Sequence, residues 1–294
     1  MFWRRHADSD SRRWTSGIVL KMANALAYAL FLGIHVGFIY DNIYNPSKGK
    51  VTYITPAPWA FLVWPVLHLL FLGTIVYQFT NKGHQIIVDG ISWRFIVLML
   101  SNALFVYLWA SREYLLALLV TSLMLWMASS ITEIVREKQE PSKTSFRDWI
   151  LLHVPFSLYH GWVSVLNMLS WFAAFGVDAS IHHAGTGTKV CVFLALFHLH
   201  LSAAGHAFHS PPGDIAILTY LWAVFVQQKV WNSEFVHDVA LVFAVLASIW
   251  VFAVTMVKIR KARRARRDEE RVPLLGGDYV VVKRRAGTFL RVVW

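Results

Sequence analysis

The feature that most constrains this chain is a series of long apolar runs separated by short polar stretches. They cover approximately residues 17–40, 57–79, 91–111, 114–135, 149–176, 188–208, 214–230 and 235–257. A helix needs about 20 apolar residues to cross the hydrocarbon core of a bilayer. Only 15% of the residues are charged, against roughly 25% in soluble proteins. The sequence therefore predicts an all-α, polytopic integral membrane bundle of about eight transmembrane helices.

Two of these segments need comment. The first follows a basic tail, residues 1–16, but its 24 apolar residues are too many for a cleavable signal, so we expect an uncleaved first helix. The seventh, 214–230, ends in Gln227, Gln228 and Lys229. It either spans the membrane or is re-entrant.

The distribution of basic residues predicts the orientation, because cytoplasmic loops collect Lys and Arg. Eight crossings with a cytoplasmic N-terminus place 23 Lys and Arg on the cytoplasmic side and 5 on the other. Seven crossings would move the basic run 258–267 to the wrong side. We therefore predict that both termini are cytoplasmic, without identifying the membrane. The basic tail, residues 258–294, is expected to contact anionic lipid headgroups rather than nucleic acid.

The fifth apolar segment carries a stripe of polar residues. They are His153, Ser157, His160, Ser164 and Asn167, at steps of four, three, four and three, which places them on one face of a helix. Polar side chains within a membrane must find a partner or line a cavity. The stripe either lines a ligand cavity or makes hydrogen bonds to neighbouring helices.

Other segments combine aromatic and polar residues at helical spacing. Trp64 shares a face with His68, Asn102 shares one with Trp109, and Trp126 shares one with Ser129. We expect these faces to turn toward a shared interior. No acidic residue lies near the middle of a span, which argues against proton-coupled transport.

Histidines also recur in the sixth segment, and histidine is a common metal ligand. His198 and His209, together with His153 and His160 of the fifth segment, are candidate metal ligands, but neutral histidines that bond helix to helix are the favoured interpretation. The single cysteine, Cys191, excludes an intrachain disulfide and a cysteine-based zinc site.

Three segments resemble the tryptophan-rich sensory protein family, TspO and the peripheral-type benzodiazepine receptors. Pro58, Phe61, Trp64, Leu67, Gly73 and Tyr77 in TPAPWAFLVWPVLHLLFLGTIVY resemble its second helix. Pro155, Phe156, Ser157, Tyr159, Gly161, Trp162 and Asn167 in PFSLYHGWVSVLN resemble its fifth. Asn102, Phe105 and Trp109 resemble its third, whereas His68 stands where the family usually has tyrosine.

This resemblance implies a five-helix bundle, residues 17–176, with a pocket that binds tetrapyrroles, sterols or aromatic drug-like ligands. Residues 177–257 form a three-helix extension that the compact members lack. We therefore expect a membrane binding or sensory protein with an intramembrane aromatic pocket for a flat apolar ligand, tetrapyrrole or sterol-like. The residues expected to line or shape this pocket are Trp64, His68, Asn102, Trp109, Trp126, Ser157, His160, Trp162 and Asn167.

Two other functions stay open. One is a haem- or metal-dependent membrane oxidoreductase that uses His153, His160, His198 and His209, and the other is a facilitator that passes a small solute without ion coupling. A tetrapyrrole would enter as a ligand, and we predict no catalytic residue and no other cofactor. Gly33 and Gly37 form a step that permits close helix approach, within the bundle or in a homodimer.

Overall fold

The apolar runs form helices whose bounds lie close to those predicted. The structure is a computed structural model that describes residues 17–44, 50–138, 145–180, 182–209, 211–230, 234–271, 279–284 and 287–292. The predicted tail at residues 1–16 lies outside the described residues, as does the side chain of His209. The elements in chain order are α2 (Ile18–Tyr44), η1 (Pro58–Leu62), α3 (Val63–Tyr77), α4 (Asn81–Gly83), η2 (His84–Ile91), α5 (Arg94–Ala110), α6 (Tyr114–Lys138), α7 (Phe146–Asp148), η3 (Trp149–His153), α8 (Val154–Phe175), α9 (Thr186–His209), α10 (Pro211–Val230), α11 (Glu234–Arg271), β1 (Tyr279–Arg284) and β2 (Gly287–Val292).

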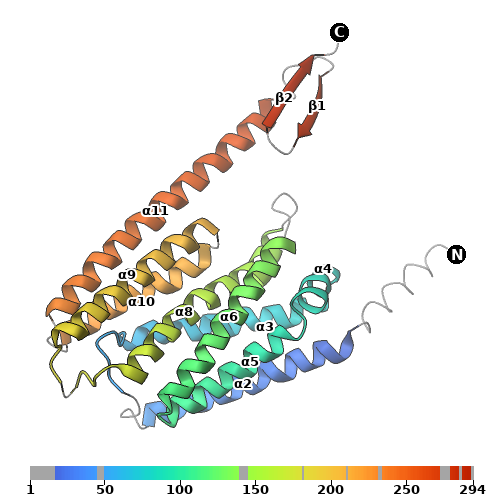
Figure 1. Ribbon diagram of the computed structural model, residues 1–294. Helices are drawn as coiled ribbons and strands as arrows, with labels where there is room; N and C mark the ends of the chain where they lie inside the picture. Colours follow the sequence, from blue (N-terminus) through green and yellow to red (C-terminus); the bar gives the residue numbers. More distant parts are fainter. Residues whose placement is uncertain are drawn as a thin grey trace. The chain divides into compact units, whose positions relative to one another are not determined.

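The chain divides into two units, residues 1–251 and 252–294. In the first, successive long helices from α2 to α10 run in alternating directions (Figure 1). The second contains the end of α11 and an antiparallel hairpin in which Tyr279 pairs with Val292 and Arg284 with Gly287. Apart from this hairpin, the described elements are helical, which confirms the predicted all-α membrane bundle.

Six helical stretches within the described residues are long and apolar enough to cross a membrane. They are Ile18–Gly37, Pro58–Tyr77, Tyr114–Lys138, Phe146–Phe175, Thr186–Phe208 and Glu234–Lys261. The pair Asn81–Ile91 and Arg94–Ala110, bent by 71°, makes a seventh if it counts as one span. The bend coincides with Ser92, whose φ of 54° is rare for a residue with a side chain. Helix α10, the segment whose crossing the sequence left open, is not among these stretches.

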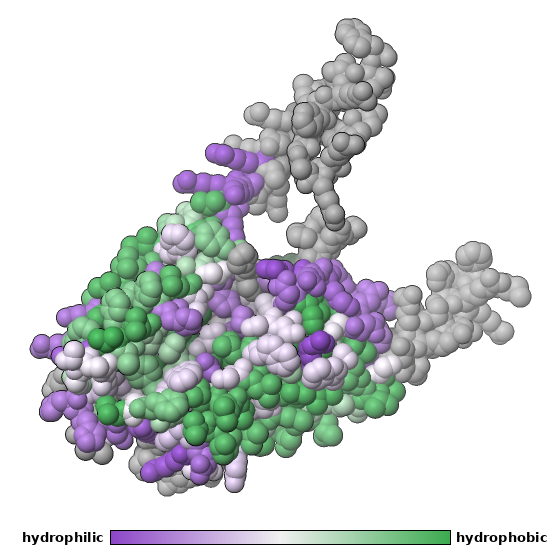
Figure 2. Space-filling model, viewed as in Figure 1, coloured by the Kyte–Doolittle hydropathy of each residue, from purple (hydrophilic) through white to green (hydrophobic). Residues whose placement is uncertain are grey.

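The surface of the bundle suits a bilayer. Large apolar side chains such as Leu26, Leu69 and Val76 are exposed on the helix flanks. Figure 2 shows hydrophobic residues over much of the side of the bundle and hydrophilic residues mainly toward its ends. Without lipid such an apolar surface would be unfavourable in water, so it marks the part of the chain that contacts the membrane.

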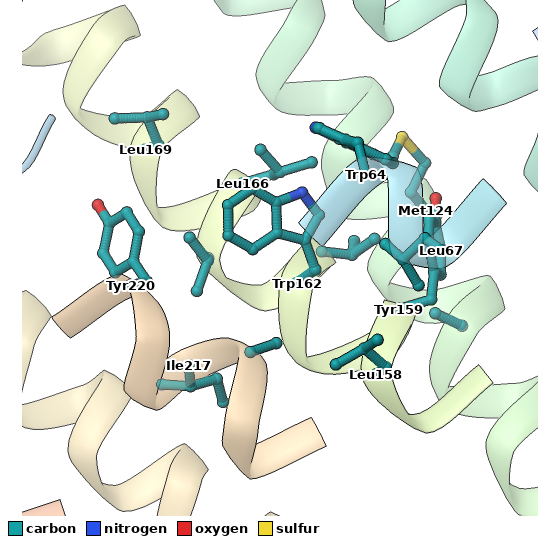
Figure 3. Packing of buried hydrophobic residues seen from close by; sticks show 14 of the residues in the cluster. Trp64, Leu67, Met124, Leu158, Tyr159, Trp162, Leu166, Leu169, Ile217 and Tyr220 are labelled. Atoms are coloured by element: carbon teal, nitrogen blue, oxygen red, sulfur yellow. The ribbon is translucent and has the colours of Figure 1, made fainter. Parts of the chain in front are cut away.

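Helix α8 occupies the centre of the first unit. It packs against α6 on one side and α10 on another, while α9 packs mainly against α10. Its fully buried Tyr159 and Trp162 lie in one continuous apolar core with Tyr220 of α10 (Figure 3). Pro155 falls in the first turn of α8, where a missing N–H is tolerated, and the π-helical turn η3 precedes it.

Hydrogen bonds join α10 to the earlier segments. Tyr220 Oη on α10 donates to the carbonyl of Ile54, 2.5 Å away, and the Ala57 N–H donates to the carbonyl of Ala223 at 3.0 Å. On α8, Ser157 Oγ accepts from the Gly213 N–H at 3.0 Å. The segment before α3 therefore lies against α10. The boundary at residue 176, between the predicted five-helix bundle and its extension, stays a prediction. Helices on its two sides pack directly against each other.

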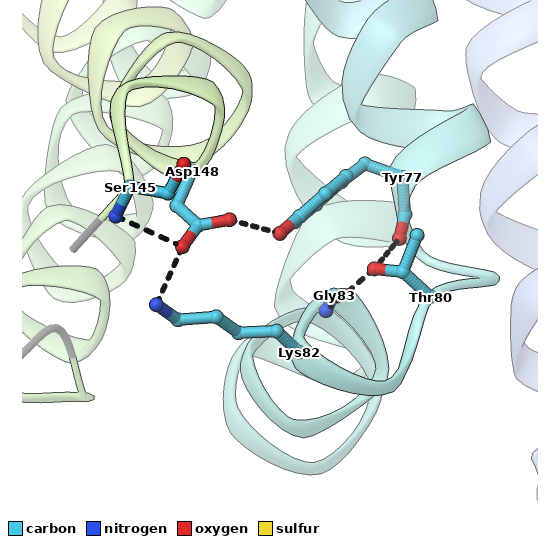
Figure 4. Close-up of polar contacts among 6 residues, drawn as sticks. All are labelled: Tyr77, Thr80, Lys82, Gly83, Ser145 and Asp148. Atoms are coloured by element: carbon cyan, nitrogen blue, oxygen red, sulfur yellow. Dashed lines mark hydrogen bonds and ion pairs between the residues drawn. The ribbon is translucent and has the colours of Figure 1, made fainter. Parts of the chain in front are cut away.

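A polar cluster joins α3, α4 and α7 at one end of the bundle, which we call the α6–α7 end. The buried carboxylate of Asp148 accepts from Tyr77 Oη, from Lys82 Nζ at 2.5 Å and from the Ser145 N–H at 3.2 Å (Figure 4). Ser145 and Asp148 form a capping box that begins α7. The cluster thus connects helices that are more than 60 residues apart in sequence.

Candidate functional site

A cavity of about 470 Å³ lies between α6, α8 and α9. Helix α8 contributes its floor, and α6 and α9 contribute its two walls. Polar side chains dominate the lining, with a few apolar ones among them. The lining residues are Leu125, Ser129, Thr132, Glu133, Arg136, His153, His160, Ser164, Asn167, Met168, His198, Ser202, Gly205 and His206.

The floor of the cavity is the polar stripe of α8. His160, Ser164 and Asn167 of α8 all line it, and His153 at the end of η3 continues the stripe. Ser157 lies at the edge of the stripe, nearer to α10, where its hydroxyl accepts from the Gly213 N–H. One face of one helix therefore supplies hydrogen-bonding groups along the length of the cavity.

His160 stands in the middle of this floor, and its proton position follows from its neighbours. Ser129 Oγ donates to the carbonyl of Leu125 at 2.8 Å. The oxygen of Ser129 is then free to accept from His160 Nε2, 2.9 Å away. The ring of His160 also packs edge-on against His206, with centroids 4.7 Å apart. These contacts hold α6, α8 and α9 around a polar centre.

The two ends of the cavity differ in charge. At one end Asn167 Nδ2 donates to the hydroxyls of Thr121 at 3.3 Å and Ser122 at 3.0 Å, which joins α8 to α6. At the α6–α7 end, Arg136 Nη2 lies 2.7 Å from Glu133 Oε1, and each side chain is 48% exposed. The cavity is thus polar and uncharged near Asn167 and charged at the α6–α7 end.

The lining covers only part of the membrane thickness. On α6 it extends from Leu125 to Arg136, which is about 16 Å at a rise of 1.5 Å per residue. The whole of α6 has 25 residues, or about 37 Å. Along η3 and α8 the lining runs from His153 to Met168, which is about 22 Å, so the cavity reaches from the α6–α7 end past the middle of the bundle.

Three of the residues predicted to line a pocket gather in the solid core instead. Trp64 is 5% exposed, and its ring lies 6.1 Å from that of Trp162, which is fully buried (Figure 3). His68 Nε2 is 2.8 Å from His35 Nδ1. The rings of this group fill the space between α2, α3 and α8, and none of the three residues lines the cavity.

The other predicted residues are spread over the bundle. Asn102 is buried and donates to Tyr159 Oη. Trp109 packs against Phe105 and Tyr114, with ring centroids 5.7 and 5.4 Å away. Trp126 is 63% exposed on the outer face of α6. Of the nine residues predicted, the structure brings only His160 and Asn167 to the cavity, and a role of the others in ligand binding stays a prediction.

Several lining residues were outside that prediction. Ser129 and Glu133 belong to the same polar face of the fourth apolar segment as Trp126, and Ser202 and His206 continue the spacing of four from His198. In the sequence, the residues that mark the cavity lining are therefore the small hydroxyls and the histidines rather than the tryptophans. A polar side chain that faces lipid is costly unless it finds a partner, whereas the largely apolar indole ring packs well in the core.

The predicted metal ligands do not assemble among the described residues. His153, His160 and His198 all line the cavity, but no three His, Cys, Asp or Glu side chains within the described part of the chain come together as a metal site would require. The ring of His153 stacks on Trp149 with centroids 6.4 Å apart.

Comparison with known protein families identifies the chain. The model of a family described as TSPO-like protein matches residues 15–258. This chain belongs to the TSPO-like family. No curated protein and no solved structure matches it. The match reaches from α2 into α11, so it includes the last three helices, and the TSPO-like chain is an integral multi-pass membrane protein.

One TSPO-like motif residue has a clear packing role. A Cβ on Gly161 of α8 would lie 2.1 Å from the carbonyl oxygen of Gly213 on α10. No side chain fits at that distance, so glycine is needed where the two backbones meet. This close contact brings α10 against α8.

Proposed function

We propose that this TSPO-like chain is a membrane binding protein that takes a flat, largely apolar ligand of tetrapyrrole or sterol type into the cavity between α6, α8 and α9. The observation that carries the proposal is the polar stripe of α8, which faces a cavity inside the apolar part of the bundle. Such groups are retained within a membrane where they meet a partner. The family resemblance adds the ligand class.

The size and the chemistry of the cavity fit this class. Its volume of about 470 Å³ falls in the range of 300–1,000 Å³ usual for small-molecule sites. Leu125 and Met168 offer apolar contact, and Met side chains adapt to flat ligands. His160, Ser164 and Asn167 offer hydrogen bonds at successive positions along α8. A sensory role would follow if the ligand changes how α9 packs across the cavity.

A direct test introduces a large side chain on α9 that occupies the cavity. Purified protein in lipid nanodiscs is titrated with protoporphyrin IX, and binding is followed by quenching of tryptophan fluorescence. We expect saturable binding that Ser202→Trp abolishes, because Ser202 lines the cavity. Leu201→Trp is the matched control, since the neighbouring Leu201 is exposed on the outer surface of α9.

Two outcomes would contradict the proposal. One is the absence of saturable binding of either protoporphyrin IX or a fluorescent sterol. The other is binding that Ser202→Trp and Leu201→Trp leave equally strong, which would place the ligand elsewhere on the protein.

A further inference from the structure

We propose that the ligand of this cavity is an acidic amphiphile, which enters at the α6–α7 end and places its carboxylate on Arg136 while its body lies along α8. This inference rests on the proposed function, because it names the class of ligand that the same cavity takes. It depends on the position, the exposure and the present partner of Arg136.

Arg136 is the one Lys or Arg side chain in the lining, and it stands at the α6–α7 end. A guanidinium matches a carboxylate with two parallel hydrogen bonds, which an ammonium group does not. Apart from its partner Glu133, the polar groups of the lining are hydroxyl, amide and imidazole groups. An anionic group on the ligand therefore has its best partner at this end.

The present partner of Arg136 is easily exchanged. Glu133 is one turn away on the same helix, and both side chains are about half exposed. Exposed pairs of this kind contribute little to helix stability. A ligand carboxylate can therefore take the place of the Glu133 carboxylate without disturbing the fold, and the aligned, partly desolvated pair that results would be stronger.

The depth of the cavity fixes which end of the ligand carries the charge. Arg136 lies two residues from the end of α6, whereas the part of the cavity at Ser164 and Asn167 holds polar but uncharged groups. A carboxylate near the bilayer centre would be costly without a buried cation. An amphiphile bound with its acid at the α6–α7 end and its apolar body deeper meets both conditions.

The basic character of this end also favours anions over cations. The side chain of Lys138 is exposed on the same last turn of α6 as Arg136. Positive charge around a cleft raises the local concentration of anionic ligands and speeds their entry. An amine ligand would have to rely on Glu133 alone.

The experiment compares an acid with its ester. Protoporphyrin IX carries two carboxylates, and its dimethyl ester has the same ring without them. With the full chain in nanodiscs of neutral lipid, we expect the diacid to bind at least tenfold more tightly than the diester. Arg136→Gln should weaken binding of the diacid about tenfold, which corresponds to about 1.4 kcal/mol, and leave the diester unchanged.

Two further variants serve as controls for this test. Arg147→Gln removes an exposed arginine at the same end that does not line the cavity, and it should leave binding of both compounds unchanged. Glu133→Gln removes the competing carboxylate while preserving Arg136, so it should strengthen binding of the diacid or leave it unchanged. A fall in diacid affinity in Glu133→Gln would overturn the inference.

The results separate this inference from the proposed function. If both compounds bind, and Ser202→Trp blocks both, but Arg136→Gln has no selective effect on the diacid, the cavity binds a ligand and the acidic class is wrong. If neither compound binds to the native chain, the proposed function fails together with the inference. If Arg136→Gln weakens the diacid and the diester equally, Arg136 shapes the cavity without recognising a carboxylate.

Discussion

Asp148 shows what a single charged residue can do at the end of this bundle. Its carboxylate is buried and accepts hydrogen bonds from Tyr77, Lys82 and Ser145, which come from three separate segments. Hydrogen bonds to a charged group contribute about 1.5–3 kcal/mol each, and a donor left without its partner costs more than the bond itself contributed. Glu133, by contrast, is half exposed in a pair within one helix.

We therefore expect Asp148→Asn to destabilise the protein by about 1–3 kcal/mol, while Glu133→Gln changes stability by less than about 0.5 kcal/mol. Unfolding in a detergent titration, followed by tryptophan fluorescence, measures both. A second test is Lys82→Met, which leaves the buried carboxylate without its cation and should be rescued in part by Asp148→Asn. Equal effects of Asp148→Asn and Glu133→Gln would show that the cluster does not stabilise the fold.

The candidate site shows how far single residues can be predicted. His160 and Asn167 could be assigned to a polar face from spacing alone, and both line the cavity. Trp64 and Trp162 also lie on the inner faces of their helices, but they contact each other and fill the core. Spacing determines the face of a helix. It does not determine which helix covers that face, and this distinguishes a packed ring from a cavity wall.

At the scale of helices, the apolar runs predict the elements well and their ends less well. The run 114–135 became Tyr114–Lys138, and 188–208 became Thr186–His209. Helix α11 continues to Arg271, well past the predicted 257, because Lys, Arg, Glu and Ala are good helix formers in water. The bend at Ser92 and the π-helical turns depend on tertiary contacts that no local pattern contains.

The contact between α8 and α10 provides a prediction for a pair of helices. Gly161→Ala places a methyl group 2.1 Å from the Gly213 carbonyl oxygen, so the two helices must separate. We expect a loss of at least about 1–3 kcal/mol, the usual effect of overpacking. Gly33→Ala is the matched control, because nothing lies within 4 Å of a Cβ there, and alanine favours a helix by up to about 1 kcal/mol over glycine.

Unfolding in detergent distinguishes these two glycines. A Gly161→Ala protein that unfolds like the native one would mean that α8 and α10 do not touch as described. Gly33 and Gly37 are exposed on the outer side of α2, so the homodimer that the sequence allows stays a prediction. The control is therefore measured at a low protein-to-detergent ratio, where association contributes least.

At the scale of the whole molecule, the path of α10 decides how the chain crosses the membrane. Its composition excludes it from the apolar spans, yet its 20 residues make a helix of about 30 Å. Its Asp214 and Gln228 are buried. Because α10 packs on α8 and α9, these side chains face protein instead of lipid, and average hydropathy is a poor guide for such a helix. We therefore expect α10 to cross the membrane.

If α10 crosses, the number of membrane crossings is even, and we expect the basic tail from residue 258 to lie on the same side of the membrane as the N-terminus. There it would meet anionic headgroups, each basic residue contributing on the order of 1 kcal/mol near the surface. This arrangement keeps 23 of the 28 basic residues on one side, as the distribution of charge in membrane proteins requires. A re-entrant α10 would instead place that tail on the opposite side.

Cysteine labelling tests this parity, because Cys191 is the only native cysteine and Cys191→Ser clears the background. Single cysteines are then placed at Gln85, at His183 and at Thr288, and sealed right-side-out vesicles are treated with a membrane-impermeant maleimide. We expect His183→Cys to react at once, and Gln85→Cys and Thr288→Cys to react only after permeabilisation. Gln85 and His183 are both exposed. Three long helices, α5, α6 and α8, separate them in the chain, so they lie at opposite ends of the bundle (Figure 1). Reaction of Thr288→Cys together with His183→Cys would mean an odd number of crossings, and α10 would then be the helix that turns back.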